Sequence, residues 1–133
     1  MRRIVAVGFV IWLGATVALR VGGQFVFPEA GIAGPLVLLL VTLPLMVLVT
    51  RAVLAGVRDR ALGAIALVAP GMLLDTFSTI WFARVFPNMR ADTAPMFGGW
   101  LLFCNVVVLL TAALWPVTVA ICEMRSSARG LYM

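Results

Sequence analysis

Four long apolar runs, separated by short segments rich in polar and helix-breaking residues, account for most of the sequence. They cover approximately residues 4–27, 32–54, 61–83 and 94–121. Each run is long enough for an α-helix to cross the roughly 30 Å hydrocarbon core of a bilayer, which takes about 20 residues. The pattern therefore predicts an all-α fold: a bundle of four transmembrane helices that form one membrane domain over residues 1–133.

The first run has a second interpretation, as a secretory signal peptide. Residues 1–3 supply a basic start, and the small residues Thr16 and Ala18 fit the spacing of a cleavage site. Against cleavage, the apolar stretch through Ala18 is long for a signal peptide, and the helical pattern continues to Phe27. We therefore expect a transmembrane helix that is retained.

Composition strengthens the membrane assignment. Hydrophobic residues make up 64% and charged residues 11% of the 133 positions, whereas globular domains average about 45–50% and 25%. Because nearly all of the chain lies in the four runs, no extramembrane domain is expected, and the lipid bilayer is the main partner. Any functional site must be formed by the helices and the short turns between them.

The distribution of arginine predicts the orientation. All ten basic residues are arginine. With four spans, one side of the membrane receives Arg2, Arg3, Arg51, Arg58, Arg60, Arg125 and Arg129, and the other receives Arg20, Arg84 and Arg90. Since cytoplasmic segments carry the excess of basic residues, both termini are predicted to be cytoplasmic. Trp81 and Trp100 then fall near the outer ends of their helices, where interfacial aromatic residues are expected.

The chain offers little for catalysis or for cofactors. It has no histidine, and its two cysteines, Cys104 and Cys122, are eighteen residues apart on one predicted helix. That spacing is about 27 Å, whereas a disulfide needs Cα atoms within about 7 Å. Two distant thiols also make a poor metal site. We expect no disulfide, metal, cofactor or enzymatic activity, and no nucleic-acid partner, because the arginines are scattered over helix ends.

Polar residues from all four predicted helices fall at a similar depth. Counted at 1.5 Å per residue, Arg20, Asp75 and Asn105 lie roughly 10–16 Å from the outer surface. The other polar residues near this level are Thr42 and, somewhat closer to the outer surface, Gln24, Ser78 and Thr79. The pattern predicts a polar layer in the outer half of the bundle, and this layer is the candidate binding site.

Two charged residues in this layer are expected to meet. A charged side chain in hydrocarbon normally finds a partner, so Arg20 is predicted to pair with Asp75. Ser78 and Thr79 follow Asp75 by three and four residues, which places their hydroxyls on its helical face. Three interpretations stay open: a structural ion pair, a site for a ligand, ion or proton, and separate roles in which Arg20 reaches the outer interface alone.

Small residues indicate a packing face on the first helix. Gly14, Ala18 and Gly22 recur every four residues, a spacing that lets another helix approach closely. The partner is either the fourth helix of the same bundle, or a second copy or a larger membrane protein.

The segments 71–78, 85–88 and 97–102 carry a resemblance. They resemble an uncharacterised family of small four-helix bacterial membrane proteins. The resemblance implies a four-helix membrane fold in the bacterial inner (plasma) membrane, but no activity, ligand or residue role. The small multidrug exporters are also four-helix proteins. They resemble one another in a membrane glutamate of the first helix, where this chain has Arg20.

Two functions are consistent with these features. The leading hypothesis is a non-enzymatic accessory or interaction subunit, because a packing stripe is present and catalytic motifs are not. The alternative is a minimal oligomeric transporter or channel that uses the intramembrane Asp75 as a cation or proton site.

Overall fold

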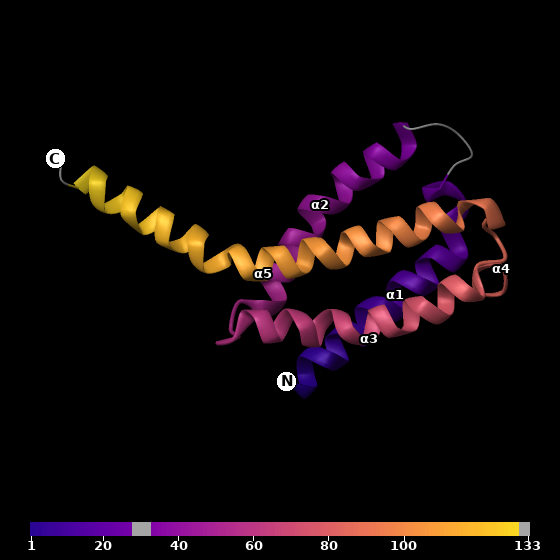
Figure 1. Cartoon of the computed structure of the whole chain (residues 1–133), viewed down its shortest axis with the longest axis horizontal. Coiled ribbons are helices and arrows are strands. Elements are labelled where there is room, and N and C mark those ends of the chain that lie inside the picture. Colours follow the sequence, from indigo (N-terminus) through magenta and orange to yellow (C-terminus); the bar gives the residue numbers. More distant parts are fainter. Residues whose placement is uncertain (28–32, 131–133) are drawn as a thin grey trace.

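The computed structural model describes residues 1–27 and 33–130, and places the side chains of residues 1–27 and 36–115. Within these residues the chain is all-α (Figure 1). The elements are α1 (Arg2–Val26), α2 (Ala33–Leu54), α3 (Arg60–Ile80), the short α4 (Phe82–Val85), the 3₁₀ turn η1 (Ala91–Thr93) and α5 (Ala94–Gly130).

The four predicted spans are confirmed. Four helices, α1, α2, α3 and α5, are long and apolar enough to cross a membrane. The third ends earlier than predicted, at Ile80, because the backbone of Trp81 leaves the helical conformation with φ −103° and ψ 34°. The fourth continues past residue 121 to Gly130 and has 37 residues. The predicted start of the second span at Ile32 lies outside the described residues.

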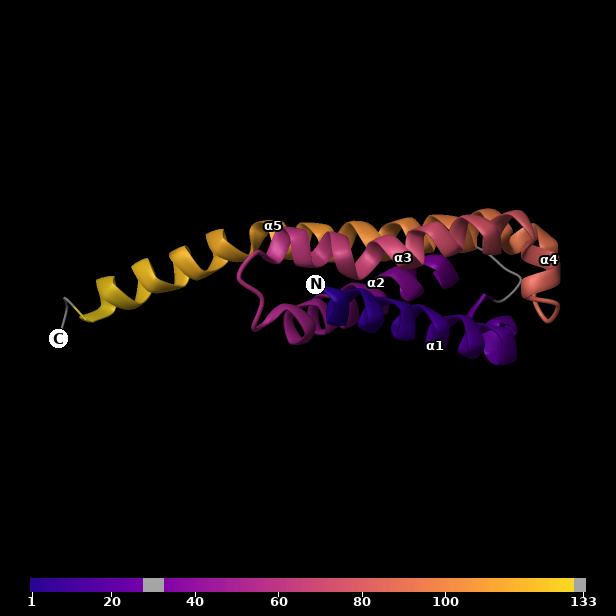
Figure 2. The same ribbon diagram turned by 90° about the horizontal axis from the view of Figure 1, so that it is seen from below.

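The long helices pack in a chain, α1 on α3, α3 on α5, and α5 on α2. Figure 2 shows the result as two layers, with α3 and α5 in one and α1 and α2 in the other. Few contacts join α1 to α2 directly. The bundle is therefore least tightly closed between its first two helices.

Two hydrophobic clusters hold the bundle together at different levels. One lies toward the α4 end and contains Leu19, Phe27, Phe82, Phe86, Met89 and Phe97. The other lies toward the opposite end and contains Leu54, Ala64, Leu67, Val68, Val108 and Ala112. Asp75 and Asn105 lie between these two clusters, at the level of the candidate site.

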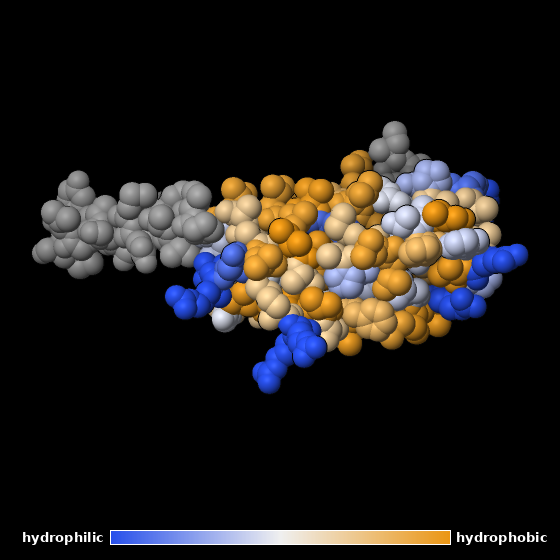
Figure 3. All heavy atoms as spheres, turned by 60° about the horizontal axis from the view of Figure 1, so that its bottom comes forward, coloured by the Kyte–Doolittle hydropathy of each residue, from blue (hydrophilic) through white to orange (hydrophobic). Residues whose placement is uncertain are grey.

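The outer surface has the polarity of a protein surrounded by lipid. Large apolar side chains such as Leu40, 73% exposed, and Leu73, 68% exposed, point away from the bundle. Figure 3 shows that hydrophobic residues cover the middle of the visible face and that hydrophilic residues gather toward its ends. Lipid tails can cover such a band, which would be unfavourable in water.

The small-residue stripe does not pack against another described helix. Ala18 is exposed, and a Cβ added at Gly14 or Gly22 would meet no atom within 4 Å. The helix packs through Gly8 instead, where an added Cβ would collide with the backbone carbonyl of Leu67 in α3. At 100° per residue, Gly14 lies about 120° around the helix from Gly8, so it faces away from α3. The expectation that the stripe serves the fourth helix is corrected accordingly.

Gly8 and Gly14 give a matched test of this packing. Gly8→Ala is expected to destabilise the protein by about 1–3 kcal/mol, because the methyl group forces α1 away from Leu67. Gly14→Ala should be neutral or slightly stabilising, because its Cβ meets open space. Unfolding in mixed micelles measures both variants, and equal stabilities would contradict the placement of α1.

Candidate functional site

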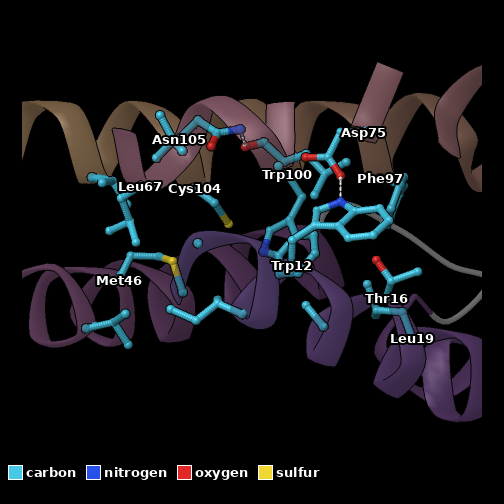
Figure 4. Close-up of a pocket in the computed structure, with 18 residues that line it drawn as sticks. Trp12, Thr16, Leu19, Met46, Leu67, Asp75, Phe97, Trp100, Cys104 and Asn105 are labelled. Carbon is cyan, nitrogen blue, oxygen red and sulfur yellow. Dashed lines mark hydrogen bonds between the residues drawn. The ribbon is translucent and has the colours of Figure 1, made fainter. Parts of the chain in front are cut away.

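A cavity of about 150 Å³ lies at the centre of the bundle, between the two hydrophobic clusters. All four long helices line it, and most of the lining is apolar. Its polar groups include Thr16 from α1, Asp75 from α3, and Cys104 and Asn105 from α5 (Figure 4). Among the described lining residues, Asp75 is the only one with a formal charge. The predicted polar layer therefore surrounds a cavity that contains one carboxylate.

Trp12 is the hydrogen-bond partner of Asp75. Its indole Nε1 donates to Oδ1 of the carboxylate over 2.7 Å, which joins α1 to α3 (Figure 4). Gly71, one turn before Asp75, lies beside the indole, since a Cβ there would be 3.4 Å from Trp12 Cδ1, an ordinary van der Waals contact. Trp12 was not among the predicted site residues. The sequence does contain a signal for it, because Trp12 places an indole N–H in the middle of an apolar run, and a buried indole N–H normally has a hydrogen-bond partner.

Arg20 does not pair with Asp75, contrary to the prediction. Its Nη1 donates to the backbone carbonyl of Val85 over 2.9 Å, and the side chain is exposed. The physical reason is the register of the two helices, in which Trp12 packs beside Gly71 and lies level with the turn before Asp75. Arg20 is eight residues further along α1, about 12 Å nearer the α4 end. It therefore reaches Val85, the last residue of α4, and acts separately from Asp75, as in the third interpretation of the sequence.

Of the remaining predicted residues, Asn105 and Thr79 line openings beside Asp75, whereas Ser78 does not. Asn105 lines the central cavity with Asp75, and both also line a groove on the other side of α3 and α5, together with Thr79. Nδ2 of Asn105 donates to the carbonyl of Leu101 over 2.9 Å. Ser78 is buried and Thr79 is exposed, and among the described contacts neither hydroxyl bonds to Asp75. The structure thus brings Asp75, Asn105 and Thr79 together and leaves out Arg20.

A second tryptophan fixes the other side of the layer. Nε1 of Trp100 donates to Oγ1 of Thr42 over 3.0 Å and joins α5 to α2. Thr42 is only 4% exposed. The ring of Trp100 packs against Phe27 and Phe97, so it faces the interior of the bundle. Gln24 is exposed and does not line the cavity.

The family comparison covers most of this site. The model of a family of unknown function, DUF5367, matches residues 30–116. The chain belongs to this family. The match confirms the resemblance to an uncharacterised family, whose segments all fall inside the matched region. No curated protein and no solved structure matches the chain.

The DUF5367 match divides the site between its two tryptophan contacts. Thr42, Asp75, Trp100 and Asn105 lie inside the matched residues, whereas Trp12 lies before them. The carboxylate and the α2–α5 contact therefore belong to the matched region. The donor that holds the carboxylate comes from α1.

A double-mutant cycle tests the Trp12 contact. Trp12→Phe and Asp75→Ala are each expected to destabilise the protein by about 1–3 kcal/mol, because each leaves a part-buried polar group without its partner. The double mutant should lose less than the sum of the two. The same cycle between Arg20→Gln and Asp75→Ala serves as the control and should be additive within about 0.5 kcal/mol. Additivity in the Trp12 cycle would show that the two side chains do not interact.

Proposed function

We propose that this DUF5367 protein is a non-enzymatic, multi-pass protein of the bacterial inner membrane that binds and conducts a small cation or a proton. The observation that carries the proposal is the lone carboxylate of Asp75 at the central cavity. The alternative weighed from the sequence, a minimal oligomeric transporter or channel, therefore becomes the leading function.

The carboxylate of Asp75 has no positively charged neighbour among the described residues that line the cavity. A carboxylate within the hydrocarbon layer is costly unless a cation or hydrogen-bond donors neutralise it. Asp75 accepts one hydrogen bond, from Trp12, and Arg20 is engaged with Val85. No described cationic side chain lines the cavity with it. A bound cation or proton would remove this cost, so the site favours such a ligand.

The surroundings of Asp75 also offer two approaches. One carboxylate lines both the central cavity and the groove formed by α3 and α5. A group that passes between two compartments needs a site that is accessible from each of them. The groove lies on the outer side of the bundle, where a second copy in an oligomer would enclose it. In such an oligomer Asp75 would lie at the interface between copies, where a conduction pathway could pass.

The accessory-subunit function is the second candidate. The observation in its favour is the face that Gly14, Ala18 and Gly22 form on α1, since no described helix packs against the glycines of this face. In this reading, a second copy or a larger membrane protein packs there. Native mass spectrometry from nanodiscs separates the two functions, because a retained partner of different mass supports the accessory subunit, whereas a homo-oligomer without other proteins supports the transporter.

Proton flux provides the direct test of Asp75. In liposomes with an imposed K⁺ diffusion potential, the wild-type protein should accelerate the quenching of an internal pH dye. Asp75→Asn should reduce that rate at least tenfold, to the level of empty liposomes. Asp92→Asn is the control, because Asp92 is exposed and paired with Arg90 at the surface.

Two results would contradict the proposed role of Asp75 in conduction. Equal flux in the wild-type and Asp75→Asn proteins would contradict the assignment of Asp75. A wild-type protein that carries no protons, but retains a partner protein in native mass spectrometry, would establish the accessory function instead.

The proposed orientation has its own test. Seven of the ten arginines lie on the side of the two termini, which supports a cytoplasmic location for both. A green fluorescent protein fused to the C-terminus should be fluorescent, and alkaline phosphatase inserted after Asn88 should be active. The reverse pattern would contradict this orientation.

A further inference from the structure

Two arginines converge on one tryptophan at the end of the bundle opposite α4. Arg51 lies in the last turn of α2, Arg60 is the first residue of α3, and Trp115 lies on α5. The guanidinium carbons of Arg51 and Arg60 are 5.7 Å and 4.4 Å from the centroid of the Trp115 ring. Three helices thus present two positive charges on a single aromatic surface.

Neither guanidinium group forms an ion pair with another described residue. Both guanidinium groups gain a cation–π contact with the ring, but two like charges held against one ring repel each other. The nearest acid in the sequence, Asp59, caps α3 by accepting a hydrogen bond from the Leu62 amide over 3.0 Å. The Nε atom of Arg60 is buried and has no hydrogen-bond partner in the described part of the chain.

The chemistry of the cluster specifies the ligand. A guanidinium group presents a planar set of N–H donors that matches the oxygens of a phosphate group. Tryptophan is enriched at the membrane surface, where lipid headgroups lie. Arg51 and Arg60 flank the turn between two spanning helices, so their side chains are at headgroup level. A lipid phosphate can approach this position without leaving the bilayer.

We propose that Arg51, Arg60 and Trp115 form a binding site for the phosphate of an anionic lipid. The two guanidinium groups bind the phosphate oxygens, and the indole ring holds both side chains against the bundle. The lipid then bridges α2, α3 and α5 at the end where only a short turn connects α2 to α3. The site is separate from Asp75 and does not depend on the proposed cation conduction.

Thermal unfolding of the full-length protein in a neutral detergent tests the site. Dioleoylphosphatidylglycerol should raise the Tm of the wild-type protein by roughly 5 °C, whereas dioleoylphosphatidylcholine should have little effect. Arg51→Gln and Arg60→Gln should each lose at least half of this rise. Arg84→Gln, which removes an exposed arginine near α4, is the matched control and should keep it.

Native mass spectrometry gives a second measurement, independent of stability. Phosphatidylglycerol adducts should remain on the wild-type and Arg84→Gln proteins and be depleted at least fivefold on the Arg51→Gln/Arg60→Gln double variant. If Arg60→Gln does not fold, Arg51→Gln and Arg51→Lys provide the comparison. The lysine variant should keep part of the binding through its charge and lose the bidentate contact.

Three results would overturn the proposal. The first is an equal rise in Tm with the anionic and the zwitterionic lipid. The second is a rise of the same size with inorganic phosphate, which would assign the site to a free anion. The third is a wild-type protein whose Tm does not respond to phosphatidylglycerol.

Discussion

The hydrogen bond from Trp12 to Asp75 is the contact on which the candidate site depends. It joins α1 to α3 over 2.7 Å at the level of the central cavity. The close approach at Gly8 sets the register of the two helices and so makes this contact possible. The same register places Arg20 nearer the α4 end, where it binds the Val85 carbonyl. One alignment therefore determines which group faces the carboxylate.

The sequence predicts the spans well because each of them is a local property. Twenty or more apolar residues in a row can satisfy their backbone groups in lipid only as a helix, whatever the neighbouring helices do. The pairing of Arg20 with Asp75 is not local. It was inferred from the depth of each residue below the end of its own helix, which assumes that the helix ends are level. The packing of Trp12 beside Gly71 instead carries α1 past the end of α3 at Ile80. An error of one turn, about 5 Å, is enough to change the partner.

The face through which a helix packs can be predicted only when the surfaces of the neighbouring helices are known. Gly14, Ala18 and Gly22 have the spacing of a helix-packing face, yet α1 approaches α3 through Gly8, which lacks that pattern. The hydrogen-bond partners of Trp12 and Trp100 could not be predicted for the same reason. Composition places Trp100 in an interfacial belt, but its N–H has a buried acceptor in Thr42. Which donor meets which acceptor depends on the order in which four helices pack, and the order α1–α3–α5–α2 does not follow the chain.

The two ends of the bundle differ in how their arginines are held, and this difference bears on the function. Near α4, Arg20 donates to a backbone carbonyl and Arg90 pairs with Asp92. At the opposite end, Arg51 and Arg60 share the ring of Trp115. Between these ends, Asp75 is the one charge at the cavity, and no described arginine reaches it. A carboxylate kept apart from positive charges on both sides is available to a mobile cation. A fixed ion pair would have occupied the same group permanently.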